Sequence, residues 1–114
     1  MNKIEFNKNA ITINGTDIIF ENNIYQIEED NNKIYVLLDI PPKEKLLYND
    51  VHNIYCYSKK GDKLWQIGNR DRSDDAVYTM IRIADSELYA NDFLGRRYKI
   101  DKDSGEIEDM VVVK

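Results

Sequence analysis

The side chains best suited to catalysis are scarce in this sequence. His52 is the single histidine and Cys56 the single cysteine. A nucleophile–histidine pair needs a serine or cysteine whose position in the chain suggests a place beside the histidine, and no spacing here indicates one. We therefore interpret His52 as a hydrogen-bonded or exposed loop histidine. Cys56 lies between Tyr55 and Tyr57 in an expected strand, so it should face the opposite side of the sheet from both and form a buried, inert thiol.

One run of carboxylates superficially resembles a calcium loop. Asp101-Lys102-Asp103-Ser104-Gly105 is followed by Glu108 and Asp109. The third ligand position lacks a carboxylate, and the glycine comes one residue early. Turn formation explains Asp101 and Gly105 without a metal. No two carboxylates have a spacing that suggests a glycosidase pair. We expect no metal, no cofactor and no enzymatic activity.

Two acidic segments are candidates for binding a basic protein. The net charge of −5 favours encounters with such a partner. The alternative interpretation is that both segments are solvated turns. The eight tyrosines could likewise form a recognition surface or pack in the core. The candidate partner-binding residues are Glu28, Glu29, Asp30, Asp71, Asp74 and Asp75.

Charge and composition exclude several classes of function. Basic residues are interrupted by acidic ones near Asp62 and Asp101, so no basic stripe for nucleic acid is expected. No run approaches the ~18 apolar residues of a membrane span. The N-terminal segment has no apolar stretch of the signal-peptide kind, and the lone cysteine suits a reducing compartment. We expect a cytoplasmic protein, and abundant Asn, Lys, Ile and Asp suggest a bacterial one.

The elements that carry these residues are predicted to be strands. Apolar and polar residues alternate with period two, and no window of helical length shows the helical period. Asn14-Gly15 suits the positive φ angles of a tight hairpin turn. Pro41 to Asp50 should form a loop or one short helical turn, and Gly68 to Asp75 a connection. The expected strands are 10–13, 17–20, 24–27, 33–38, 54–58, 63–67, 77–83, 87–91, 96–100 and 107–113.

These strands form two related four-stranded meanders. Asn23-Ile24-Tyr25 and Lys33-Ile34-Tyr35 correspond to Ala76-Val77-Tyr78 and Glu87-Leu88-Tyr89. Repetition of such a unit is typical of propeller blades. We predict a single all-β domain over 1–114, of suitable length for one core. It comprises an N-terminal hairpin (1–22), a first blade-like unit (23–68) and a second (75–114).

Glu87 to Asp92, Gly95 to Asp101 and Ser104-Gly105-Glu106 resemble a blade of the quinoprotein-type (PQQ-like) β-propeller repeat. The first unit is similar to such a blade in Tyr55 to Gly61. It has Trp65 four residues after the glycine, where such blades commonly place a tryptophan. The second unit departs from the pattern, with Asp109 at the equivalent position. The resemblance implies a blade-like fold. It does not imply the quinone cofactor or dehydrogenase activity, because two blades cannot close a ring around a cofactor.

Three functions are compatible with this reading. The first is a protein-binding module, specifically a bacterial immunity protein that neutralises a basic toxin. The second is a carbohydrate-binding, lectin-like module whose chains assemble into a propeller ring. The third is a partner that completes another propeller. Because Ile11, Ile13, Ile18 and Phe20 can cover a sheet face, we predict sandwich or half-barrel packing and a monomer or weak dimer.

Overall fold

The computed structural model describes residues 4–70 and 75–112, which form an all-β structure as the sequence predicts. Every pair of neighbouring strands is antiparallel. The elements are β1 (Ile4–Asn7), β2 (Ala10–Ile13), β3 (Thr16–Ile19), β4 (Ile24–Glu29), β5 (Lys33–Leu38), α1 (Tyr48–Val51), β6 (Ile54–Ser58), β7 (Lys63–Gln66), β8 (Tyr78–Ala84), β9 (Glu87–Asp92), β10 (Arg96–Ile100) and β11 (Ile107–Val112).

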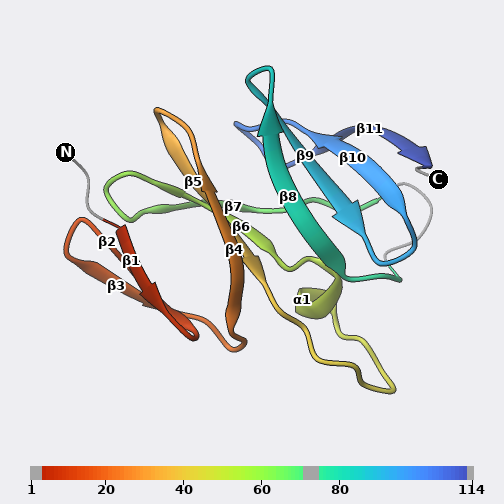
Figure 1. Cartoon of the computed structure of the whole chain (residues 1–114), viewed down its shortest axis with the longest axis horizontal. Helices are drawn as coiled ribbons and strands as arrows, with labels where there is room; N and C mark the ends of the chain where they lie inside the picture. The colour runs from red at the N-terminus through yellow and green to blue at the C-terminus, as the bar shows by residue number, and fades with distance from the viewer. Residues whose placement is uncertain (1–3, 71–74, 113–114) are drawn as a thin grey trace.

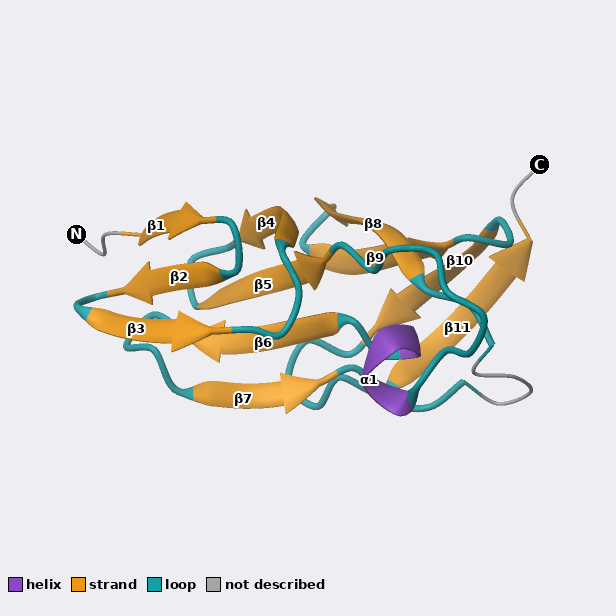
Figure 2. Ribbon diagram, turned by 90° about the horizontal axis from the view of Figure 1, so that it is seen from below, coloured by secondary structure: helices purple, strands orange, loops and turns teal. Residues whose placement is uncertain are grey.

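The strands form three sheets, which we call the N-terminal, middle and C-terminal sheets. The N-terminal sheet has the order β1-β2-β3, the middle sheet β4-β5-β6-β7 and the C-terminal sheet β11-β10-β9-β8. The last two are the predicted four-stranded meanders. Figures 1 and 2 show the sheets stacked in chain order, with the middle sheet between the other two. The sheets do not close into a barrel, so the packing is sandwich-like.

The predicted N-terminal hairpin is present, with one strand more than expected. Asn14 and Gly15 have φ angles of 49° and 84°, and Ile13 pairs with Thr16 across this tight turn. The additional strand β1 pairs with β2. Its sequence, Ile4-Glu5-Phe6-Asn7, does alternate apolar and polar residues, but four residues are a weak signal next to the polar run that follows.

Two hydrophobic cores separate the three sheets, and β5 contributes to both. Ile34, Val36 and Leu38 belong to the core shared with the N-terminal sheet. Tyr35 and Leu37 belong to the core shared with the C-terminal sheet. Alternate side chains of a strand point to opposite faces, so a strand between two sheets is apolar throughout. The N-terminal core also contains Ile11, Ile13, Phe20 and, at its margin, Ile18, as predicted.

The segment before β6 contains the predicted short helical turn, α1. The carboxylate of Asp50 accepts a hydrogen bond from the Leu47 N–H (2.7 Å) and lies 2.6 Å from the Lys43 ammonium. Burial acts to raise the pKa of Asp50, but these two contacts stabilise the charged form and hold the pKa below its usual value. Asp50 therefore fixes the start of the helix and the loop that precedes it.

Strand pairing confirms the internal repeat and shows how the units pack. In the middle sheet Tyr35, Cys56 and Trp65 lie in one row across the strands. The matching row of the C-terminal sheet is Tyr89, Lys99 and Asp109. The first row is buried between the two sheets, whereas the second lies on the outer face of the C-terminal sheet. The sheets therefore pack front to back, with non-equivalent faces in contact.

Both outer faces of the stack are polar. On the C-terminal sheet, Cys56 and Trp65 are replaced at equivalent positions by Lys99 and Asp109, and Lys99 pairs with Glu87 (3.3 Å). On the N-terminal sheet the outer row is Glu5, Thr12 and Asp17, in which the Thr12 hydroxyl donates to Asp17 (2.6 Å). Polar outer faces are what terminates a stack of repeats. The central row of each outer face is therefore polar, whereas the matching row of the middle sheet is apolar.

Two side-chain amides join the middle and C-terminal sheets by imitating strand pairing. Gln26 accepts from the Ile81 N–H (2.9 Å) and donates to the Ile81 carbonyl (2.6 Å). The buried Asn53 makes the same pair of bonds with Tyr78, at 3.0 Å each, and also donates to the Leu38 carbonyl. The edge of β8 thus has its backbone groups satisfied at two positions without joining the middle sheet.

Candidate functional site

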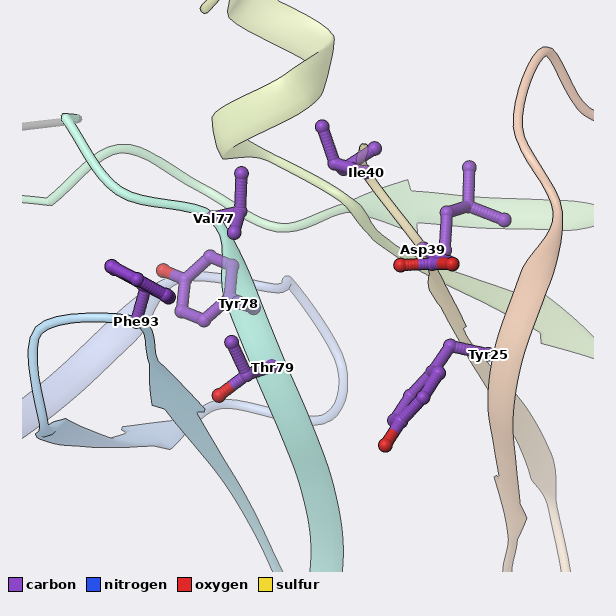
Figure 3. A pocket seen from close by; sticks show the side chains of 8 residues that line it. Tyr25, Asp39, Ile40, Val77, Tyr78, Thr79 and Phe93 are labelled. Carbon is purple, nitrogen blue, oxygen red and sulfur yellow. The ribbon is translucent and has the colours of Figure 1, made fainter. Parts of the chain in front are cut away.

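A groove with exposed aromatic side chains lies between the edge strands β4 and β8. It has a volume of about 220 Å³. Figure 3 shows Tyr25, Asp39 and Ile40 on one side and the β8 residues on the other, with Phe93 beyond Tyr78. We call this feature the β4–β8 groove. It is lined by Tyr25, Leu38, Asp39, Ile40, Val77, Tyr78, Thr79 and Phe93.

Equivalent parts of the two meanders build the groove. A β-bulge inserts Tyr25 into β4, and another inserts Thr79 at the matching place in β8. Asp39 and Phe93 each follow the strand after the bulge, and their N–H groups donate to the equivalent carbonyls of Asn23 (2.8 Å) and Val77 (2.9 Å). Bulges redirect side chains and are frequent at sheet edges near functional sites. The groove is thus the junction of two equivalent strand ends.

Strand pairing shows that the sequence alignment of the two units needs one correction. Ile24 pairs with Leu38, and Tyr78 pairs with Asp92, which occupies the position equivalent to Leu38. Ile24 therefore corresponds to Tyr78, one residue later than the sequence comparison placed it. Ile24-Tyr25 matches Val77-Tyr78 by residue type, but the register is set by strand pairing, which the residue types alone do not fix.

The turn after β9 presents apolar side chains to solvent from a rigid frame. Phe93 is 75% exposed and Leu94 56% exposed. The buried carboxylate of Asp92 accepts hydrogen bonds from the N–H groups of Leu94 and Arg96, both at 3.0 Å. Turns usually carry polar residues, and these two side chains contribute little to the core. Their exposure on a preorganised turn is the observation that most favours a binding role.

A buried polar cluster supports this turn from behind. Asp92 also accepts from the Arg96 guanidinium (2.8 Å) and the Tyr98 hydroxyl (2.9 Å). The Arg70 guanidinium stacks over Tyr78, with its carbon 4.0 Å from the ring centroid, and donates to the Ala76 carbonyl (2.8 Å). Burial, and then the bond to Asp92, raises the pKa of Tyr98 to about 12. These groups fix the floor of the groove and do not enter it.

Asp39 is the charged residue of the groove. Its side chain is exposed, and its backbone is fixed by the bond to Asn23. Among the residues that the structure describes, no cationic side chain forms an ion pair with it. Tyr25, which is 64% exposed, lies on the same side of the groove. The groove thus combines aromatic surface with one uncompensated negative charge.

The groove contains few of the side chains that hold metals or transfer protons. In 4–70 and 75–112 no group of three or more His, Cys, Asp or Glu side chains could hold a metal ion. The groove itself contains one carboxylate and no histidine or cysteine. Aromatic rings beside a carboxylate are suited to binding cationic and apolar groups.

The structure gives three predicted acidic residues local partners at the β4–β5 turn. Glu28 accepts from Gln26 (3.3 Å), and Glu29 pairs with Lys59 (3.0 Å). Asp30 accepts from the Lys33 N–H and the Tyr35 hydroxyl. Burial acts to raise the pKa of Asp30, but its hydrogen bonds and Lys102 hold it below the usual value. These contacts give the segment a structural role, and its role in docking stays a prediction.

Asp75, the described residue of the second acidic segment, lies near the opposite end of β10 from Asp30. Asp75 pairs with Arg96 (3.0 Å) at the start of β10, whereas Asp30 lies 3.7 Å from Lys102, beyond the end of β10. The structure therefore does not bring Asp75 and Asp30 together. Asp71 and Asp74 lie outside the described residues. Asp75 is the member of the predicted set that shares the groove's end of the molecule, through Arg96 and Asp92.

His52 and Cys56 have the surroundings that the sequence suggests. Buried His52 is hydrogen-bonded to the Tyr48 carbonyl (2.7 Å) and the Asn69 side chain (2.8 Å), and it stacks on the Tyr48 ring. Cys56 is fully buried, and burial raises its pKa to about 12, so the thiol is protonated and inert near neutral pH. It faces the core opposite to that of Tyr57, as predicted.

The calcium-like run forms a turn that packs against the middle sheet. Asp101 accepts from the Asp103 N–H (2.8 Å), and Asp103 pairs with Lys33 (3.0 Å). Gly105 has a φ of 79°, and its Cα faces the ring of Trp65. The turn therefore connects the two meanders, and its carboxylates are used in local contacts.

Sequence analysis did not single out Tyr25, Asp39 or Phe93. These residues are distant in the chain and meet only because β4 and β8 lie side by side. One local signal was present: Phe93-Leu94 is an apolar pair in a turn, directly before Gly95, where polar residues are usual. An apolar pair without a core to fill indicates a contact surface.

Comparisons with known proteins give one match. No curated protein and no solved structure matches the chain. In the described part of the chain, no helix has the length and apolar character required to cross a membrane. A family model described as "Domain of unknown function (DUF7957)" matches residues 1–112. Because this match spans nearly the whole length, the chain belongs to the DUF7957 family.

Proposed function

We propose that this protein is a non-enzymatic protein-binding module and that the β4–β8 groove and the adjoining Phe93-Leu94 turn form its contact surface. The supporting observation is the exposure of these two apolar side chains on a turn that buried Asp92 holds in place. Aromatic side chains presented by a rigid frame lose little entropy on binding, which suits a hot spot of an interface.

In its most specific form, the proposal is a bacterial immunity protein that occludes a basic toxin enzyme in the cytoplasm. The net charge of −5 favours association with a basic surface. Uncompensated Asp39 places one of these charges inside the contact surface. A stack of three sheets with two full cores supplies the rigidity that a blocking protein needs.

The polar outer faces favour this proposal over a lectin-like ring. A ring of blades would pack the outer face of each C-terminal sheet against another sheet. The row Tyr89, Lys99 and Asp109 is charged where the middle sheet has an apolar row, so such a contact would bury ionised groups without an apolar core. The blade resemblance therefore supports the shape of each unit, and we propose no ring.

The proposal is tested by calorimetric titration against a basic protein identified as the partner by pull-down with the native chain. We expect 1:1 binding. The double variant Phe93→Ser/Leu94→Ser should weaken it at least tenfold, because exposed hot-spot aromatics carry much of an interface's free energy. The matched control is Val111→Ser/Val112→Ser, which removes two exposed apolar side chains from β11. Equal affinities of the two double variants would refute the groove as the contact surface.

A further inference from the structure

We infer that the β4–β8 groove receives an arginine side chain of the partner protein, with its guanidinium group between the Asp39 carboxylate and the Tyr25 ring. This inference rests on the proposed function and names the chemistry that the groove recognises. It follows from the size of the groove, its charge and the orientation of its aromatic residues.

The size of the groove matches one side chain. Its volume of about 220 Å³ lies below the roughly 300–1,000 Å³ typical of sites for whole small molecules. Leu38 and Tyr78 are buried and close the floor, so the occupant enters from the solvent side. Asn53 holds this floor rigid, because it bonds to the backbone of both residues. A preformed slot of this size accommodates a single long side chain of a folded partner.

The charge of the groove selects a cation. Asp39 is the only carboxylate among the lining residues, and no lysine or arginine lines the groove. The described cations nearby are engaged elsewhere: Arg70 contacts Tyr78 and Ala76 below the floor, and Arg96 bonds Asp92 and Asp75. An anionic occupant would meet an uncompensated negative charge in an acidic protein. A cationic occupant would neutralise it.

The aromatic surface favours arginine over lysine. Figure 3 shows the Tyr25 ring beside the groove on the same side as the Asp39 carboxylate. A guanidinium is planar and weakly hydrated, so it stacks on a ring while donating two hydrogen bonds to a carboxylate. The same protein already uses this contact internally, where the Arg70 guanidinium lies 4.0 Å from the Tyr78 ring centroid. A lysine ammonium is more strongly hydrated and cannot make the bidentate contact.

The test uses three blocked tripeptides as probes: acetyl-Gly-Arg-Gly-amide, the lysine analogue and the norleucine analogue. Each is titrated to 50 mM into the ¹⁵N-labelled full chain, and amide shifts are followed by NMR. We expect the arginine peptide to shift the amides of Tyr25, Asp39 and Thr79 with saturation. The lysine peptide should bind at least threefold more weakly and the norleucine peptide at least tenfold. No saturable shift, or equal affinities for all three peptides, would overturn the inference.

Two variants identify the groups responsible. Asp39→Asn should weaken binding of the arginine peptide at least fivefold, since it removes the charge and keeps the shape. The control Asp62→Asn removes an exposed carboxylate at the opposite end of the middle sheet and should leave the affinity within twofold. Equal effects of both variants would show general charge attraction and overturn the inference.

The same variants separate this inference from the proposed function. If the partner protein binds Asp39→Asn as tightly as the native chain but loses affinity for Phe93→Ser/Leu94→Ser, the groove is the contact surface and the arginine assignment is wrong. If the partner tolerates Phe93→Ser/Leu94→Ser but the arginine peptide binds as expected, the groove recognises arginine and the proposed contact surface is wrong.

Discussion

The contact between Gly105 and Trp65 gives the sharpest stability prediction. An alanine Cβ at position 105 would lie 2.6 Å from Cε3 and 2.7 Å from Cδ2 of the Trp65 ring. The ring cannot move freely, because its Nε1 donates to the Lys102 carbonyl (2.8 Å) and its other face is packed in the core. The φ of Gly105 is +79°, which adds backbone strain for any residue with a Cβ.

The backbone strain and the steric overlap at position 105 each lower the free energy of unfolding by a separate amount. A positive φ costs an alanine about 1–2 kcal/mol relative to glycine. Overpacking a closed contact costs about 1–3 kcal/mol more. Gly105→Ala should therefore lower the free energy of unfolding by about 2–5 kcal/mol. Gly15→Ala is the matched control: its φ is +84°, but nothing lies within 4 Å of the added Cβ, so about 1–2 kcal/mol is expected.

Urea unfolding followed by far-UV circular dichroism measures all of these variants, including those that lack Trp65, the single tryptophan. The difference between them isolates the clash between the sheets. Adding Trp65→Leu to Gly105→Ala should make the glycine substitution cost no more than it does at position 15. If Gly105→Ala costs the same as Gly15→Ala in the native background, the packing of this turn on Trp65 is wrong.

Three further predictions concern a contact between the sheets, the acid dependence of stability and the oligomeric state. Asn53→Ala should cost about 3 kcal/mol by urea unfolding, because it leaves buried backbone groups of Tyr78 and Leu38 without partners; no loss would contradict its bridging role. The pKa values of Asp30 and Asp50 are lowered in the folded state, so their stabilisation is present above about pH 4 and is lost as pH falls through the folded pKa values. Asp50→Asn should reduce this acid dependence in unfolding curves between pH 5 and 2, and an unchanged slope would refute it. Light scattering at micromolar concentration should give the 13.4 kDa monomer, whereas a stable trimer would contradict the polar ends of the stack.

Local patterns in the sequence predict most of the strands but not how the sheets meet. Asn14-Gly15 fixes a turn by its backbone preferences, and alternation around Cys56 assigns its face, because both depend on neighbours in the chain. The front-to-back order depends on which face of each meander is apolar. The replacement of Trp65 by Asp109 carries that information, because it makes the equivalent face of the C-terminal sheet polar.

The groove could not be predicted for a related reason. Tyr25 and Thr79 reach it through bulges. Asp39 meets them only because Gln26 joins β4 to β8 and Asn53 joins the end of β5 to β8. Such contacts depend on tertiary structure and produce no periodic pattern of residues in the sequence. The acidic segments were visible as composition, but the structure shows that Glu29 and Asp30 already have cationic neighbours in Lys59 and Lys102.

The central claim is that the partner meets the groove and not an outer sheet face. Photocrosslinking tests it directly, with p-benzoylphenylalanine placed at Phe93 in one sample and at Asp109, on the outer face of the C-terminal sheet, in the other. Each is irradiated with the partner protein used for calorimetry. The account predicts a covalent adduct from position 93 and none from position 109. An adduct from position 109 alone would contradict it.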